Sequence, residues 1–145
     1  MSRAPTLPEL LGKIEEIRPV LERNAGQTEA DRRVVEENID ALTAAGAFKV
    51  TVPHRFGGFQ MTVREKLEVS AAVAESCGST GWVVALTNVC NWMASVLGDQ
   101  AQQDIFGANP DARGPAGTRS PIHWSTRRST ARHCSGSPTR TTSRR

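Results

Sequence analysis

The chain has 145 residues and a formal net charge of +3, a length that favours one domain with one core. No run reaches the roughly 18 apolar residues of a membrane span, and no charged N-terminal region precedes a hydrophobic core, so neither a span nor a secretion signal is indicated. We therefore expect a cytoplasmic protein. The three cysteines are an odd number without a C-x-x-C pair, which argues against a zinc site and against a disulfide framework.

The charge is distributed unevenly along the chain. Residues 113–145 contain 8 arginines and no Asp, Glu or Lys, whereas residues 1–112 hold the other 10 basic residues and all 15 acidic ones and carry a net charge of −5. Ile122 and Trp124 are the only large apolar residues of the second part, too few to offset the entropy lost on ordering. The sequence predicts a folded domain over residues 1–112 and a disordered Arg/Ser/Thr-rich tail over residues 113–145.

The first two predicted helices occupy the N-terminal third. Apolar residues recur at i, i+4, i+7 and i+11 on one helical face: Leu10, Ile14, Ile17 and Leu21. Pro8 suits a first turn, whereas Pro19 is expected to kink or end this helix. Thr28 is the expected cap of a second helix, "EADRRVVEENIDALTAAG", which ends at Gly46.

A connector and a third helix follow. The segment "FKVTVPHRFGGFQM" is predicted to be irregular, because Pro53 lacks a backbone donor and the glycines at 57 and 58 permit unusual backbone angles. Thr62 and Glu65 form the T-x-x-E pattern of a capping box, which predicts a helix over residues 63–77.

The fourth predicted helix begins at Ser79 or Thr80 and ends at Gly98, and a short fifth helix begins at Asp99 and ends before Asn109. No internal repeat and no strand-like alternation is present. The sequence therefore predicts an all-α domain of about five helices.

The fourth helix carries the residues that bear on function. Its polar residues fall within about a third of the circumference: Thr87, Asn88, Asn91 and Ser95. The opposite side is apolar and includes Trp82, as in a core helix packed on several sides. Buried asparagines need partners for their amides. An indole near a helix N-terminus can also cover an electron-rich or anionic ring, so a ligand site is the alternative.

The order of these segments resembles the N-terminal helical domain of the acyl-CoA dehydrogenase superfamily. The segments are "ALTAAGAFKVTVPHRFGGFQM", "VSAAVAESCGSTGWVVAL" and "GDQAQQDIFGANPDA". Residues 46–58 match the superfamily pattern, and the step from Gly81 to Trp82 is typical of its flavin-dependent monooxygenase branch. That branch comprises oxygenase components that hydroxylate aromatic or steroid-derived phenols with reduced flavin from a separate reductase. The resemblance covers roughly residues 8–112.

The resemblance implies a helical N-terminal domain, a β-barrel middle domain and a C-terminal four-helix bundle, usually in a homotetramer. Flavin, FMN or FAD, would be held between domains and subunits. By position, Trp82 corresponds to the tryptophan that approaches the flavin, while Asn88, Asn91 and Trp92 lie on the helix that borders the substrate pocket. No catalytic residue and no metal site is identified.

The tail departs from the family pattern. Where relatives enter the middle domain with an apolar strand and a flavin loop, this chain reads "RGPAGTRSPIHWSTRRSTARHCSGSPTRTTSRR". We expect that a frameshift near Arg113 replaced the remaining domains and left an inactive or partial fragment, which the nucleotide sequence after codon 113 would test. The alternative is a noncatalytic helical binding or assembly fragment whose basic tail binds nucleic acid nonspecifically.

Overall fold

The computed structural model describes residues 3–107, and the predicted tail over residues 113–145 lies outside them. Six α-helices make up the described part: α1 (Leu7–Arg23), α2 (Ala25–Asp31), α3 (Glu36–Ala45), α4 (Val63–Ser76), α5 (Gly78–Ser95) and α6 (Asp99–Gln102). A 3-10 turn (His54–Phe56) and a π-helical turn (Gln103–Gly107) complete it, and no strand occurs within residues 3–107. The all-α prediction is therefore confirmed. None of these helices is long and apolar enough to cross a membrane.

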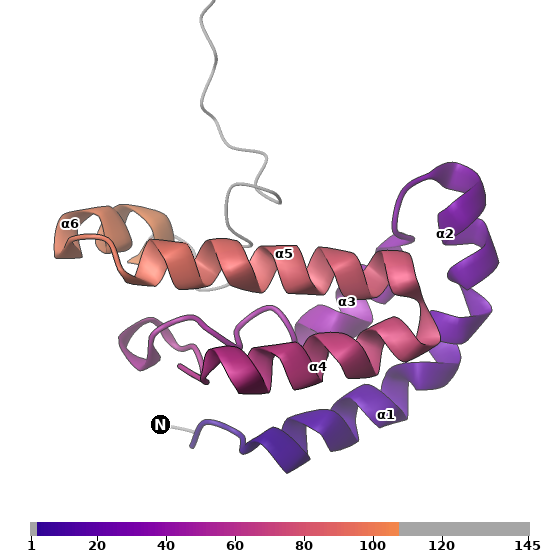
Figure 1. Cartoon of the computed structure of the whole chain (residues 1–145), viewed down its shortest axis with the longest axis horizontal. Helices are drawn as coiled ribbons and strands as arrows, with labels where there is room; N and C mark the ends of the chain where they lie inside the picture. Colours follow the sequence, from indigo (N-terminus) through magenta and orange to yellow (C-terminus); the bar gives the residue numbers. More distant parts are fainter. Residues whose placement is uncertain (1–2, 108–145) are drawn as a thin grey trace, which may run out of the picture.

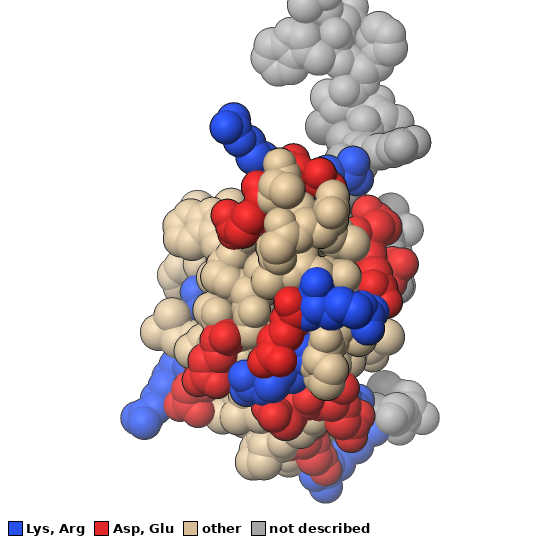
Figure 2. Space-filling view, turned by 90° about the vertical axis from the view of Figure 1, so that its right-hand side faces the viewer, with Lys and Arg blue, Asp and Glu red and all other residues tan. Residues whose placement is uncertain are grey.

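The helices are arranged around the antiparallel pair of α4 and α5 (Figure 1). α1 packs against α4 and α3, and α2 lies at one end, beside the start of α5. Charged side chains crowd the surface at this α2 end (Figure 2). The connector (residues 46–62) runs between α3 and α4.

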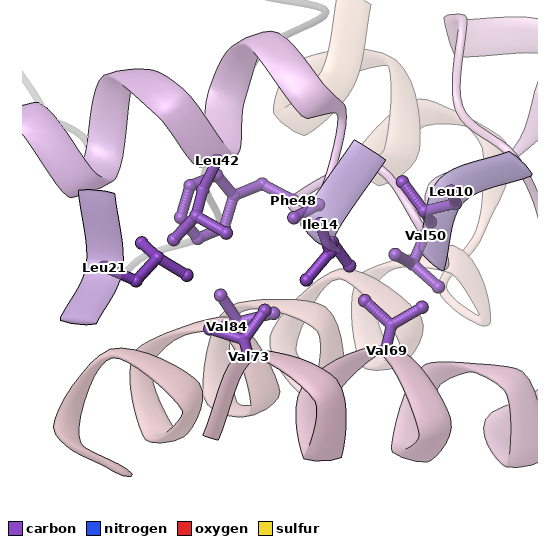
Figure 3. Close-up of a cluster of buried hydrophobic side chains, with 10 residues drawn as sticks. Leu10, Ile14, Leu21, Leu42, Phe48, Val50, Val69, Val73 and Val84 are labelled. Atoms are coloured by element: carbon purple, nitrogen blue, oxygen red, sulfur yellow. The ribbon is translucent and has the colours of Figure 1, made fainter. Parts of the chain in front are cut away.

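The main core joins α1, α3, α4, α5 and the connector (Figure 3). Its ten buried residues are Leu10, Ile14, Leu21, Leu42, Ala47, Phe48, Val50, Val69, Val73 and Val84. The apolar face predicted for the first helix is confirmed, since three of its four residues belong to this core. Burial of each large aliphatic side chain contributes about 1.5–3 kcal/mol, so tertiary packing rather than local propensity stabilises these short helices.

Near the N-terminus, an end of the first helix at Pro19 and a single second helix capped by Thr28 are not observed. α1 continues through Pro19; its apolar face is buried on both sides of the proline, and this packing outweighs the missing backbone hydrogen bond. The second predicted helix is two helices, and Thr28 lies buried inside α2 instead of capping it. Arg32 ends α2 in the left-handed conformation with φ 51°, and Val35 precedes α3 in the extended conformation that β-branched residues favour.

The start of α4 follows the sequence closely, whereas the start of α5 does not. Thr62 N donates to Glu65 Oε2 at 2.7 Å and Glu65 N donates to Thr62 Oγ1 at 3.3 Å, which confirms the capping box. α5 begins at Gly78, with Cys77 as its cap in place of Ser79 or Thr80. The reason is that the extended conformation of Cys77 reverses the chain between the two helices in a single residue.

The connector folds back on itself beside α5. Phe59 N donates to Lys49 O at 2.9 Å and Met61 N donates to Val50 O at 2.8 Å. A Cβ atom at Gly58 would lie 2.1 Å from the carbonyl oxygen of Val52, so the close approach of these two segments requires glycine. The loop predicted from its prolines and glycines is thus a compact layer against the helices.

Candidate functional site

The polar residues of α5 point inward. Asn88 Nδ2 donates to the carbonyl oxygens of Ala47 at 2.8 Å and Val84 at 3.0 Å, and Asn91 Nδ2 donates to Phe48 O at 3.0 Å. Both asparagines are 0% exposed. Their amides therefore fasten the connector to α5 by donating hydrogen bonds to buried backbone carbonyls.

Val84 of α5 is buried in the core, but most of the large apolar residues of α5 point outward, which differs from the expected helix packed on several sides. Trp82 is 68% exposed and Trp92 is 45% exposed. Other large apolar side chains of this helix and the turn after it are exposed as well: Leu86, Met93, Val96 and Leu97. The physical reason is that the connector carbonyls occupy the inner side and need donors, so the polar face is the one that the fold buries.

Gly81 sets the position of the neighbouring Trp82. A Cβ atom at Gly81 would lie 2.5 Å from Ala74 Cβ, so glycine allows α4 and α5 to cross closely at this point. The next residue, Trp82, then stands on the outer side of α5 at its first turns. In the Gly-Trp pair noted in the sequence, Gly81 thus packs against α4 and Trp82 lies on the surface.

A groove of about 770 Å³ lies beside Trp82, between the α2–α3 turn and the start of α5. It is lined by Thr28, Glu29, Arg32, Arg33, Val34, Glu36, Ile39, Gly78, Ser79, Trp82 and Val83. Ser79 Oγ donates to Glu29 Oε1 at 2.5 Å, and Arg33 pairs with Glu36 at 3.5 Å. The carboxylate of Glu29 therefore already lies at the positive end of α5, and the aromatic face of Trp82 is what the groove offers to a ligand.

The sequence did not predict this groove, because it depends on the break between α2 and α3. The available signal was the pair of β-branched residues, Val34 and Val35, inside the supposed continuous helix. A further link across the break joins Asn24 Nδ2 to Asn38 Oδ1 at 2.9 Å and Asn38 Nδ2 to Thr80 Oγ1 at 3.4 Å. These contacts hold α3 and α5 at the base of the groove.

Two carboxylates at helix starts have lowered pKa values. The backbone N–H of Thr62, followed by its hydroxyl, lowers the pKa of Glu65, and Thr6 lowers the pKa of Glu9 in the same way. Within residues 3–107 no group of three or more His, Cys, Asp or Glu residues could hold a metal ion. The groove thus combines the indole of Trp82 with the charged side chains of Glu29, Arg32, Arg33 and Glu36.

The structure brings two of the four candidate residues to one surface. Trp82, the candidate for cofactor binding, and Trp92, a candidate for the substrate pocket, both lie on the outer side of α5. Asn88 and Asn91, the other two substrate-pocket candidates, lie on its buried side. Any ligand that contacts both tryptophans therefore lies along the outer face of α5.

Comparison with known proteins identifies the relatives of this domain. The family model of the acyl-CoA dehydrogenase N-terminal domain matches residues 14–107. The FADH(2)-dependent resorcinol hydroxylase oxygenase component of Rhizobium sp. strain MTP-10005 is 35% identical in an alignment 118 residues long, which covers 77% of this chain and 29% of that protein.

Solved structures agree with this family. The 3-HSA hydroxylase from Rhodococcus sp. RHA1 has a TM-score of 0.68 and 32% identity over 71% of this chain and 27% of that one. XiaF from Streptomyces sp., solved in complex with FADH2 and glycerol, has a TM-score of 0.69 and 27% identity over 72% of this chain and 26% of that one. The chain thus spans less than a third of each of these relatives. On the matched residues 14–107, the chain belongs to the acyl-CoA dehydrogenase N-terminal domain family, and its relatives include flavin-dependent oxygenase components of the branch that its sequence resembles.

Proposed function

We propose that the chain provides the N-terminal helical part of an oxygenase component that hydroxylates an aromatic substrate with reduced flavin. The observation that carries this proposal is Trp82, a 68% exposed indole that borders a groove at the start of α5. The relatives of the chain include the oxygenase component of a resorcinol hydroxylase. Trp82 would form one wall of the flavin site.

The outer face of α5 suits a flavin ring. Residues 78–98 contain no Asp, Glu, Lys, Arg or His, and the exposed indole gives a flat surface for a heteroaromatic ring. When bound, reduced flavin supplies the oxygen chemistry. The residues of this chain would orient the ring through Trp82 and exclude water through the apolar side chains that follow along α5.

We propose FAD rather than FMN as the flavin, on the names of two relatives. The resorcinol hydroxylase is named as FADH(2)-dependent, and XiaF was solved with FADH2. A separate flavin reductase would deliver the reduced cofactor, and the complete enzyme would form a homotetramer.

The substrate-pocket candidates divide into two roles. Trp92 would contact an aromatic substrate from the outer face of α5, ten residues beyond Trp82. Asn88 and Asn91 would act indirectly, because their buried amides fix α5 against the connector. They are positioning residues in this proposal.

Catalytic turnover would require residues beyond the described ones to enclose the flavin and the substrate. The groove beside Trp82 is open to solvent on the outer side of α5, and the family match ends at residue 107. We expect the 145-residue chain alone to bind flavin weakly and to hydroxylate no substrate. A noncatalytic role, with the 8 arginines of residues 113–145 binding nucleic acid nonspecifically, is the second candidate, favoured by the charge of that segment.

Anaerobic titration of reduced FAD and reduced FMN with the 145-residue chain tests the proposed function, with bound flavin followed by its own absorbance and anisotropy. We expect a Kd in the micromolar range for FAD, raised about tenfold by Trp82→Phe because a smaller ring stacks less well. Trp92→Phe is the matched control, since it also changes an exposed indole of α5 and should leave flavin binding nearly unchanged. No binding, or equal effects of the two variants, would contradict the role of Trp82. DNA binding that weakens steeply with salt, without flavin binding, would favour the second candidate.

A further inference from the structure

We propose that Asn38 is a positioning residue for Trp82. Buried hydrogen bonds through the Asn38 side chain fix the rotation of the first turns of α5, and with it the angle at which the indole meets a ligand in the groove. Asn38 lies on α3 and is 0% exposed, so it acts on a ligand through other residues. This role deepens the proposed flavin site and rests on it.

The hydrogen bonds link four side chains in a row at the base of the groove. Asn24 Nδ2 donates to Asn38 Oδ1 at 2.9 Å, and Asn38 Nδ2 donates to Thr80 Oγ1 at 3.4 Å. The Thr80 hydroxyl in turn donates to Cys77 Sγ at 3.1 Å. Asn38 and Thr80 are both 0% exposed, so water does not compete for the bond between them. The Asn38 amide therefore joins the residue after α1 to the first turn of α5.

The elements that line the groove are the ones that these hydrogen bonds join. Asn24 is the N-cap residue of α2, the helix at one side of the groove. Ile39, which lines the groove, follows Asn38 on α3, and Trp82, which also lines it, comes two residues after Thr80 on α5. The separation of α3 from the start of α5, and therefore the width of the groove, depends on the bond between Asn38 and Thr80.

Thr80 and Trp82 lie on opposite sides of α5. Two residues apart on a helix, their side chains point about 200° apart, and accordingly Thr80 is 0% exposed and Trp82 is 68% exposed. A bond that holds the Thr80 hydroxyl against α3 therefore fixes how α5 is rotated about its own axis where Trp82 leaves it. A second bond across the groove, from Ser79 Oγ to Glu29 Oε1, is exposed, so solvent competes with it. The buried bond of Asn38 is the firmer of the two.

Asn38→Leu separates a positioning role from a general loss of structure. Leucine has the same branched outline at Cγ and forms no hydrogen bond, so the variant removes both bonds of the amide. Neither partner is left without one, because Asn24 Nδ2 still donates to Glu37 Oε2 at 2.8 Å and the Thr80 hydroxyl still donates to Cys77 Sγ. The penalty for an unpaired buried polar group is therefore avoided. We expect the variant to fold, which far-UV circular dichroism and a cooperative urea transition establish.

Fluorescence anisotropy of Trp82 tests the positioning without any ligand. The full 145-residue chain with Trp92→Phe and Trp124→Phe retains Trp82 as its one tryptophan. We expect Asn38→Leu to lower the anisotropy by at least about a tenth, because the first turns of α5 then move more freely. Ser70→Ala is the control, since it also removes a buried hydrogen bond, but one within α4, and it should leave the anisotropy unchanged. Equal anisotropies of the folded Asn38 variant and its parent would overturn the proposal.

A double-mutant cycle with reduced FAD tests whether Asn38 acts through Trp82. In the 145-residue chain, we expect Asn38→Leu to raise the Kd about fivefold, less than Trp82→Phe does, because a misoriented indole still covers part of the ring. In the Trp82→Phe background the same change should raise the Kd less than about twofold, since the residue that Asn38 positions is gone.

Fold-changes that multiply in the double variant, or a Kd that Asn38→Leu leaves unchanged, would overturn the action of Asn38 through Trp82. A chain that binds no flavin contradicts the proposed function, and the anisotropy then still decides whether Asn38 positions Trp82. A chain that binds flavin through Trp82, with both readouts unaffected by Asn38→Leu, contradicts the positioning role alone.

Discussion

Asn88 is the residue on which the position of α5 depends most. Its side-chain amide donates to Ala47 O in the connector and to Val84 O one turn earlier in α5. The backbone carbonyl oxygen of Asn88 accepts a hydrogen bond from Thr51 Oγ1 at 2.7 Å. One residue thereby ties two segments of the connector to the centre of the helix. These hydrogen bonds on the buried side of α5 fix the position of the helix, and with it the position of the tryptophans on the outer face.

We expect Asn88→Ala to lower the free energy of unfolding by about 2 kcal/mol, because the buried carbonyl of Ala47 loses its donor. Chemical denaturation followed by circular dichroism measures the change. Ser95→Ala is the control, since the Ser95 hydroxyl donates to the Trp92 carbonyl within the same stretch of helix and its loss should cost less than about 0.5 kcal/mol. Equal stabilities of the Asn88 variant and the native chain would show that the amide does not hold the connector.

Among the helices, α4 begins at the capping box that its sequence predicts. Thr62 and Glu65 bond reciprocally, and the N–H and hydroxyl of Thr62 lower the pKa of Glu65 from its ordinary value of 4.5. A carboxylate with a lowered pKa in the folded state stabilises the fold fully above pH 4.5, and this contribution is lost as the pH falls through the lowered value. The stability of the start of α4 should therefore decrease in acid.

We expect Thr62→Ala to lower the free energy of unfolding at neutral pH by about 1 kcal/mol, because Glu65 N loses its side-chain acceptor. The same variant should lose less stability than the native chain between neutral pH and about pH 3, since Glu65 then has a smaller shift to lose. Urea denaturation at the two pH values measures both effects, and Thr43→Ala, on α3, is a control distant from the cap. An identical pH dependence of the two proteins would contradict the linkage.

The helices also show what the sequence could and could not predict. The capping box of α4 and the buried face of α1 are local patterns, and both were predicted correctly. The separation of α2 from α3 was missed because Arg32 adopts a left-handed conformation that its residue type does not require. The two faces of α5 were recognised, but periodicity does not say which face is buried. Carbonyls from the connector, some 40 residues earlier in the chain, decide that.

In the described domain as a whole, α4 and α5 are packed against the rest of the domain on one side and exposed on the other. The connector and α1 cover the inner side of α4 and α5, and the outer side carries exposed tryptophans, leucines and valines. A surface of this kind marks a site of interaction. The family resemblance was predicted from the sequence, whereas the outward orientation of α5, on which the flavin proposal depends, required the structure.

Hydroxyl-radical footprinting with mass spectrometry tests this orientation most directly. At a concentration low enough to keep the chain monomeric, the account predicts rapid oxidation of Trp82 and Met93, which are 68% and 57% exposed, and strong protection of Phe106 and Leu42, which are 2% and 0% exposed. Protection of Trp82 and Met93 to the same degree as Leu42 in the monomer would contradict the outward orientation of the apolar face of α5.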